Sequence, residues 1–120
     1  MEFETSEIPG SRDFVKDFLE NLSDDNGDPL KTTAYKISER LIHFSQLSLS
    51  QLMRAEKIKH LKGDVYEVRI TIKRVRYRFL GFIDQQTFYM VHAIAKKRSD
   101  VPRKDIDLAQ GRIILVQNEN

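Results

Sequence analysis

The chain has 120 residues and a mass of 14.1 kDa, which is the usual size of one domain. Apolar residues make up 40% of it and charged residues 32%, so we expect one modest core under a strongly charged surface. No apolar run approaches the roughly 20 residues that a membrane span needs, and the acidic first residues do not resemble a secretory signal peptide. The sequence has no cysteine, which excludes disulfides and thiol nucleophiles, and its three histidines lie far apart. We therefore expect a single cytoplasmic domain over residues 1–120, with no metal or cofactor.

The net charge of +2 hides an uneven distribution along the chain. Residues 1–28 contain nine acidic and two basic residues, whereas residues 57–104 contain thirteen basic and four acidic ones. Such segregation is typical of a protein that binds a polyanion. The alternative is a basic surface that is only solvated.

Helical patterns dominate the first half of the chain. Residues 2–8 could form a short strand or an extended arm. Ser11 is a suitable N-cap, and the helical spacing of the apolar residues after it predicts an amphipathic helix over 12–22. An Asp-Pro dipeptide then predicts the start of a second helix, which should span about 29–47. A short helical turn is expected near 50–55.

Strand patterns begin after Gly63. Alternating apolar and polar residues predict a strand over 65–72 and another over 75–83, and a run that is apolar on both faces predicts a central strand over 87–95. A last helix should begin at Pro102, although residues 113–116 could equally form a short closing strand.

This order of elements predicts an α+β fold with an antiparallel β-meander. The N-terminal helical pair and the C-terminal helix should pack on one face of the sheet, which leaves the other face free for a ligand.

Basic residues gather on the predicted strands. Arg74, Arg76 and Arg78 alternate along one strand and should share a face, and Arg69 on the preceding strand is near enough to join them. Three more cations follow the third strand directly: Lys96, Lys97 and Arg98.

Packing like charges this closely costs stability, so a polyanionic ligand explains them more readily than folding does. The planar fork of arginine suits phosphate because it donates two hydrogen bonds at once. In the alternative interpretation, Arg69 pairs with Glu67 or Asp64 and the other cations are solvated.

The same stretch resembles a known family over about residues 58–112. The matching pieces are Lys59 to Arg69, Tyr77-Arg78, Val91 to Arg98, Val101-Pro102 and Ala109. In their order and spacing they are similar to the RelE/HigB toxin superfamily, and the nearest branch is the HigB-like, phage-derived type. One departure is that Glu67 stands where the RelE branch has a lysine.

This resemblance implies the toxin of a type II toxin–antitoxin system with a RelE-like fold. Such toxins are metal-independent endoribonucleases that cut mRNA, usually on the ribosome, through attack of the 2′-hydroxyl on the adjacent phosphate. Their partner is a small helix-turn-helix antitoxin.

The resemblance also assigns roles to residues. Arg78 would contact the phosphate in the transition state, Lys97 would stabilise the leaving group, and Arg69 would lie under the nucleotide. His92 would act as an acid or base, because its ordinary pKa is near neutrality; the alternative is a core histidine. The remaining cations would contact backbone phosphates or ribosomal RNA: Arg74, Arg76, Lys96 and Arg98.

Two other functions stay open from the sequence. The chain could be a non-catalytic RNA-binding module, such as a degenerate toxin, or a module whose basic face binds an acidic protein.

Overall fold

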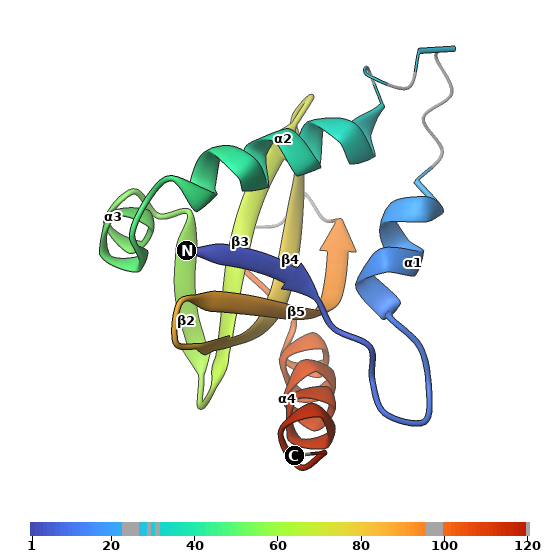
Figure 1. Ribbon diagram of the computed structural model, residues 1–120, viewed down its shortest axis with the longest axis vertical. Helices are drawn as coiled ribbons and strands as arrows, with labels where there is room; N and C mark the ends of the chain where they lie inside the picture. The colour runs from blue at the N-terminus through green and yellow to red at the C-terminus, as the bar shows by residue number, and fades with distance from the viewer. Residues whose placement is uncertain (23–26, 29, 31, 96–99, 120) are drawn as a thin grey trace.

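The computed structural model describes residues 1–22, 27–28, 30, 32–95 and 100–119. Figure 1 shows the arrangement of the helices and strands in this part of the chain. In chain order they are β1 (Glu2–Thr5), α1 (Phe14–Glu20), α2 (Thr33–Ser45), α3 (Leu49–Arg54), β2 (Ile58–Lys62), β3 (Val65–Ile72), β4 (Val75–Asp84), β5 (Thr87–Ala95) and α4 (Arg103–Gln117).

The strands form one sheet in the order β1-β5-β4-β3-β2. The three predicted strands are confirmed as β3, β4 and β5, which lie side by side and antiparallel. The structure adds a strand at each edge of this meander. β1 pairs in parallel with β5, and β2 pairs antiparallel with β3.

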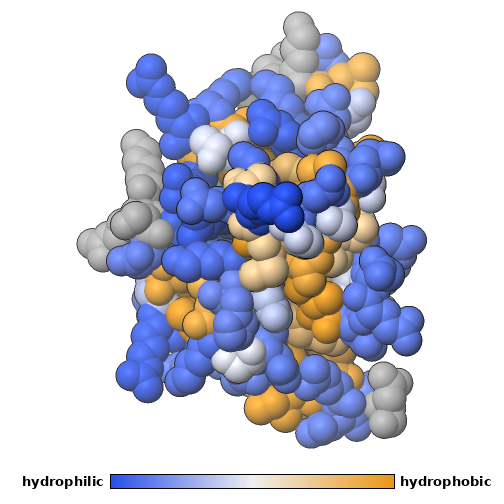
Figure 2. Space-filling model, turned by 90° about the vertical axis from the view of Figure 1, so that its left-hand side faces the viewer, coloured by the Kyte–Doolittle hydropathy of each residue, from blue (hydrophilic) through white to orange (hydrophobic). Residues whose placement is uncertain are grey.

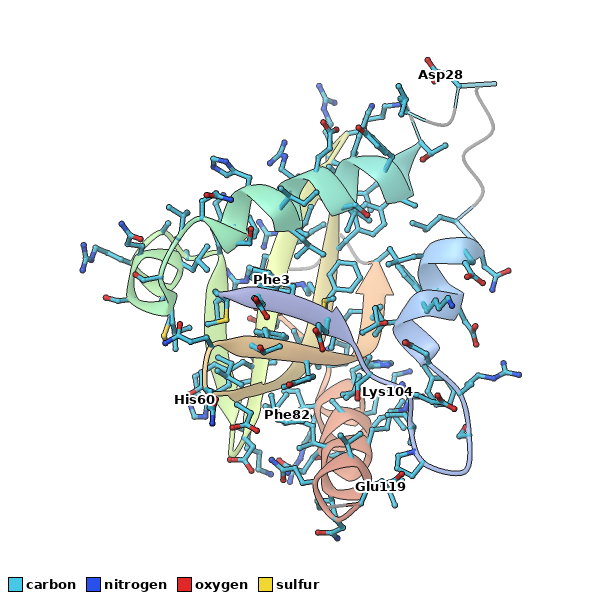
Figure 3. All side chains as sticks on the ribbon, in the orientation of Figure 1. Phe3, Asp28, His60, Phe82, Lys104 and Glu119 are labelled. Carbon is cyan, nitrogen blue, oxygen red and sulfur yellow. The ribbon has the colours of Figure 1, made fainter. Side chains whose placement is uncertain are left out.

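The two faces of the sheet carry separate apolar clusters. On the first face, Val68 and Phe79 pack with Val15 of α1, Ile37 of α2 and Leu52 of α3. On the second face, a cluster that includes Val65, Leu80 and Val91 packs with Ala109 and Ile113 of α4. Figure 3 shows Phe82, a member of the second cluster, near α4. The sheet is therefore covered on both sides.

The α+β class is confirmed, but the expected placement of all helices on one face is wrong for α4. Along this helix Asp105, Ala109 and Ile113 are buried at intervals of one turn, whereas Leu108 and Leu115 remain exposed. Apolar residues thus occur all round the helix, so periodicity could not indicate which face of the sheet it covers. α4 also continues to Gln117, so the alternative of a closing strand over 113–116 is wrong.

Two helices begin later than expected, at residues whose side chains satisfy free backbone N–H groups. Asp13, rather than Ser11, caps α1, since its side chain accepts from the N–H of Lys16. Thr32 caps α2 in the same way and accepts from the N–H of Tyr35. Asp and Thr are both favoured at this position because a helix leaves its first N–H groups without partners.

The hairpin between β3 and β4 turns through two residues, Lys73 and Arg74. Their φ angles are 49° and 70°, and the flanking Ile72 and Val75 are paired. Two left-handed residues in a two-residue loop define a type I′ turn, which favours Asn-Gly. For residues other than glycine, this conformation costs roughly 1–2 kcal/mol each.

We expect the Lys73→Asn/Arg74→Gly variant to be more stable than the wild type by about 1 kcal/mol. Its midpoint of thermal unfolding should rise by about 4 °C. Calorimetry measures this shift, and the double variant Lys73→Ala/Arg74→Ala, which keeps the strain, is the control. A midpoint for the Asn-Gly variant at or below that of the wild type would contradict this description of the turn.

Candidate nucleic-acid interface

The centre of the candidate site is an arginine cluster, by which we mean Glu67, Arg69, Arg76 and Arg78. Arg69 on β3 lies directly opposite Arg78 on β4, and Thr71 lies opposite Arg76. Because side chains alternate along a strand, all four members of the cluster share the second face of the sheet. The predicted convergence of Arg69, Arg76 and Arg78 is therefore seen.

Glu67 joins the two central arginines. Its Oε1 accepts from Nε of Arg69 at 2.6 Å, and its Oε2 accepts from Nη1 of Arg78 at 3.1 Å. The side chains of Glu67 and Arg78 are 0% exposed, and that of Arg69 is 20% exposed. Like charges directly opposite one another would destabilise the hairpin, and the carboxylate between them offsets this repulsion. The ion pair of Arg69 with Glu67 is the one that the alternative interpretation of the sequence anticipated.

Burial gives the two paired arginines different chemical roles. Arg78 is enclosed and hydrogen-bonded to Glu67, so in this conformation its guanidinium orients the cluster from within. Arg69 is partly exposed and lines a hollow of about 210 Å³ together with Arg76 and Thr71. Guanidinium groups in this position can donate paired hydrogen bonds to a phosphate.

The other predicted cations are placed differently. Arg74 lies in the hairpin turn, before β4 begins, so the expectation that it alternates along the strand with Arg76 and Arg78 is wrong. The alternation of side chains begins only at Val75, because Lys73 and Arg74 adopt the left-handed conformation of the turn. Lys96, Lys97 and Arg98 lie outside the described residues, and their roles stay predictions.

His92 belongs to a second group of polar side chains, between β5 and α4. Its Nε2 lies 2.8 Å from Oδ1 of Asp105, and its Nδ1 lies 3.1 Å from Nη1 of Arg112. The same Arg112 nitrogen donates to the carbonyl of Val91 at 3.0 Å, and the guanidinium carbon lies 3.6 Å from the ring centre of Phe14. We call His92, Asp105 and Arg112 the His92 cluster.

These contacts determine which ring nitrogen of His92 carries the proton. A guanidinium can only donate, so Nδ1 must accept, and the ring proton lies on Nε2 and is donated to Asp105. Burial lowers the pKa of His92 below its ordinary value of 6.5, and the charge of Arg112 lowers it further, against the opposing effect of Asp105. Both ring nitrogens are thus engaged in holding α4 on the sheet.

The stability of the fold should therefore decrease in mild acid. Below pH 6.5 the unfolded chain binds a proton at His92 that the folded chain does not bind, so stability falls as the pH is lowered. The loss is complete below the lowered folded pKa, where both states are protonated. One such group contributes at most about 1.4 kcal/mol per pH unit. Urea unfolding at about pH 8 and pH 5.5 should show this loss in the wild type and less of it in His92→Gln, whose amide keeps both contacts without titrating. An equal loss in both proteins would contradict it.

The sequence analysis missed Asp105 and Arg112. Both lie on α4, seven residues apart and hence on one side of the helix. An acid and a base two turns apart on a helix that also carries apolar residues were a possible signal, but their common partner, His92, becomes evident only when the position of α4 is known.

The architecture and the cluster together define a class: a small α+β protein whose meander sheet carries two arginines paired to one carboxylate, beside a hollow at the edge of β3. The chain matches the family described as "Phage derived protein Gp49-like (DUF891)" over residues 17–113. The chain belongs to this Gp49-like family, which agrees with the phage-derived type expected from the sequence. No curated protein and no solved structure matches the chain. No helix among the described residues has the length and apolar character needed to cross a membrane.

Proposed function

We propose that this protein is the toxin of a type II toxin–antitoxin system and an endoribonuclease that cleaves mRNA on the ribosome without a metal. The observation that carries the proposal is the arginine cluster, in which Glu67 aligns Arg69 and Arg78 across two strands while Arg69 and Arg76 line a hollow. Membership of the Gp49-like phage-derived family supports a toxin-like module.

The proposed reaction forms a bond from the 2′-oxygen to phosphorus and breaks the bond from phosphorus to the 5′-oxygen. The 2′-hydroxyl loses its proton, the 5′-oxygen gains one, and the products are a 2′,3′-cyclic phosphate and a 5′-hydroxyl. Negative charge accumulates on the phosphoryl oxygens in the transition state. Arg69 and Arg76 would stabilise that charge, which is usually the largest contribution to such catalysis. Lys97 is proposed to stabilise the leaving group.

A second function, RNA binding without cleavage, is favoured by one observation. His92 has both ring nitrogens engaged, and Glu67 is buried with both oxygens accepting from arginines. In this conformation the acceptor atoms of both side chains are already hydrogen-bonded within the protein. A cognate helix-turn-helix antitoxin is proposed as partner for either function.

Mapping RNA ends after expression distinguishes the two functions. For the first, we expect new 5′-hydroxyl ends within translated messages, which disappear when ribosomes are blocked and in the Arg69→Ala/Arg76→Ala variant. The control variant Arg12→Ala/Arg54→Ala removes two exposed arginines elsewhere and should cleave normally. RNA that is retained by the protein but uncut would identify the second function. If the protein neither binds nor cleaves RNA, both functions are refuted.

A further inference from the structure

A basic groove of about 880 Å³ lies beside the arginine cluster, between α2 and the free edge of β3. It exists because β2 covers only part of β3. The last pair between these strands joins Ile58 to Val68, whereas β3 continues to Ile72. We call this space the edge groove.

Basic residues line the edge groove on two sides. Lys36, Arg40 and His43 follow one another at one-turn spacing along α2, and Lys57 and Lys73 come from the sheet side. Glu39 is the single carboxylate among its lining residues in the described part of the chain. Figure 2 views the molecule from the side of α3 and β2, where hydrophilic side chains surround a strip of apolar ones.

The edge groove is continuous with the hollow of the arginine cluster. Arg40, Lys57 and Thr71 line both spaces, while Arg69 and Arg76 line only the hollow and Lys36 and Lys73 only the groove. Basic side chains therefore lead from the cluster, over the edge of β3, to α2, and the acidic lining residues beside them are Glu56 in the hollow and Glu39 in the groove. The groove also contains apolar side chains, including Leu47 and Ile72, on which the flat faces of bases can lie.

The hairpin turn gives independent support for a ligand. Lys73 and Arg74 occupy two left-handed positions where Asn-Gly would be more stable. Backbone strain of this kind is concentrated at functional sites. Here one of the two strained residues, Lys73, lines the groove.

We infer that the edge groove binds the segment of single-stranded RNA adjacent to the nucleotide held at the arginine cluster, with its phosphates on Lys36, Arg40, Lys57 and Lys73. The inference rests on the proposed function and extends it, because it makes the substrate a strand long enough to pass round the edge of β3. Phosphate contacts dominate such binding and make it dependent on salt.

The test compares two fluorescent oligoribonucleotides, a tetramer and a dodecamer, which carry 2′-O-methyl groups so that they are not cut. Their affinities for the full chain are measured by anisotropy over a range of salt concentrations. The variant Lys36→Gln/Lys73→Gln changes two residues that line only the groove. The variant Lys16→Gln/Lys62→Gln removes the same charge at exposed lysines outside both spaces and is the control. Thermal unfolding establishes that all variants fold.

We expect the groove variant to lose affinity for the dodecamer and to keep that for the tetramer. The slope of log affinity against log salt for the dodecamer should become shallower by about 1.4, for two lost phosphate contacts at about 0.7 each. The control variant should change neither. An unchanged dodecamer affinity in the groove variant overturns the inference but leaves the proposed function standing. A wild type that binds neither oligonucleotide also overturns the inference, and the proposed function is then decided by the cleavage of translated messages.

Discussion

Replacing Glu67 with alanine should lower the free energy of unfolding by about 3–5 kcal/mol. The side chains of Glu67 and Arg78 are both 0% exposed and are joined at 3.1 Å, so the variant leaves a buried guanidinium without its carboxylate. It also removes the carboxylate that lies between the charges of Arg69 and Arg78, which are directly opposite one another. Urea denaturation measures the loss. Glu20→Ala, at an exposed position on α1, is the control and should change stability by less than about 0.5 kcal/mol.

A double variant separates the loss of charge pairing from the loss of packing. Glu67→Leu/Arg78→Met replaces the ion pair with apolar side chains, and such replacements are often neutral or stabilising. We expect it to be more stable than Glu67→Ala. If Glu67→Ala unfolds at the same urea concentration as the wild type, the carboxylate does not stabilise the cluster and the description of the site fails.

Replacing Arg69 with alanine should reduce cleavage of RNA by about 10²–10³-fold, the usual effect of removing one donor that stabilises transition-state charge. The ion pair of Glu67 with Arg78 remains in this variant, so the fold should survive. Arg69 is therefore a sharper test of the chemistry than Arg78, whose removal also perturbs the core. Single-turnover cleavage on programmed ribosomes is the measurement.

Two further variants serve as controls for the result with Arg69→Ala. Arg69→Lys keeps the charge but loses the planar fork, so its rate should lie between those of the wild type and Arg69→Ala. Arg12→Ala changes an exposed arginine that does not line the hollow, and this variant should cleave normally. Wild-type rates for Arg69→Ala would exclude Arg69 from contact with the reacting phosphate.

The central strands could be predicted because their side chains alternate. Apolar and polar residues alternate at every step from Tyr66 to Ile72, and this period is specific to strands. β2 escaped prediction because it is an edge strand in which Ile58 is the one buried residue. β1 escaped firm prediction because its four residues form a strand only by pairing with β5, which is far away in sequence.

For the candidate site, the sequence predicted which arginines share a face but not how deeply each is buried. Alternation placed Arg76 and Arg78 on one face, and the hairpin brought Arg69 to them. The pattern could not indicate that Arg78 would be fully buried, because this depends on the register that sets Glu67 beside it. The cationic side of α2 was likewise missed, since its importance comes from the uncovered edge of β3 on the opposite side of the groove.

The most direct test of the central claim, that the arginine cluster receives an RNA phosphate, is to observe arginine side-chain Nε–H resonances by NMR during titration with the uncut tetramer. The account predicts shifts that saturate for Arg69 and Arg76, which line the hollow, and none for the exposed Arg12 and Arg103. Shifts confined to Arg12 or Arg103, or no shift at Arg69 when the oligonucleotide is bound, would contradict it.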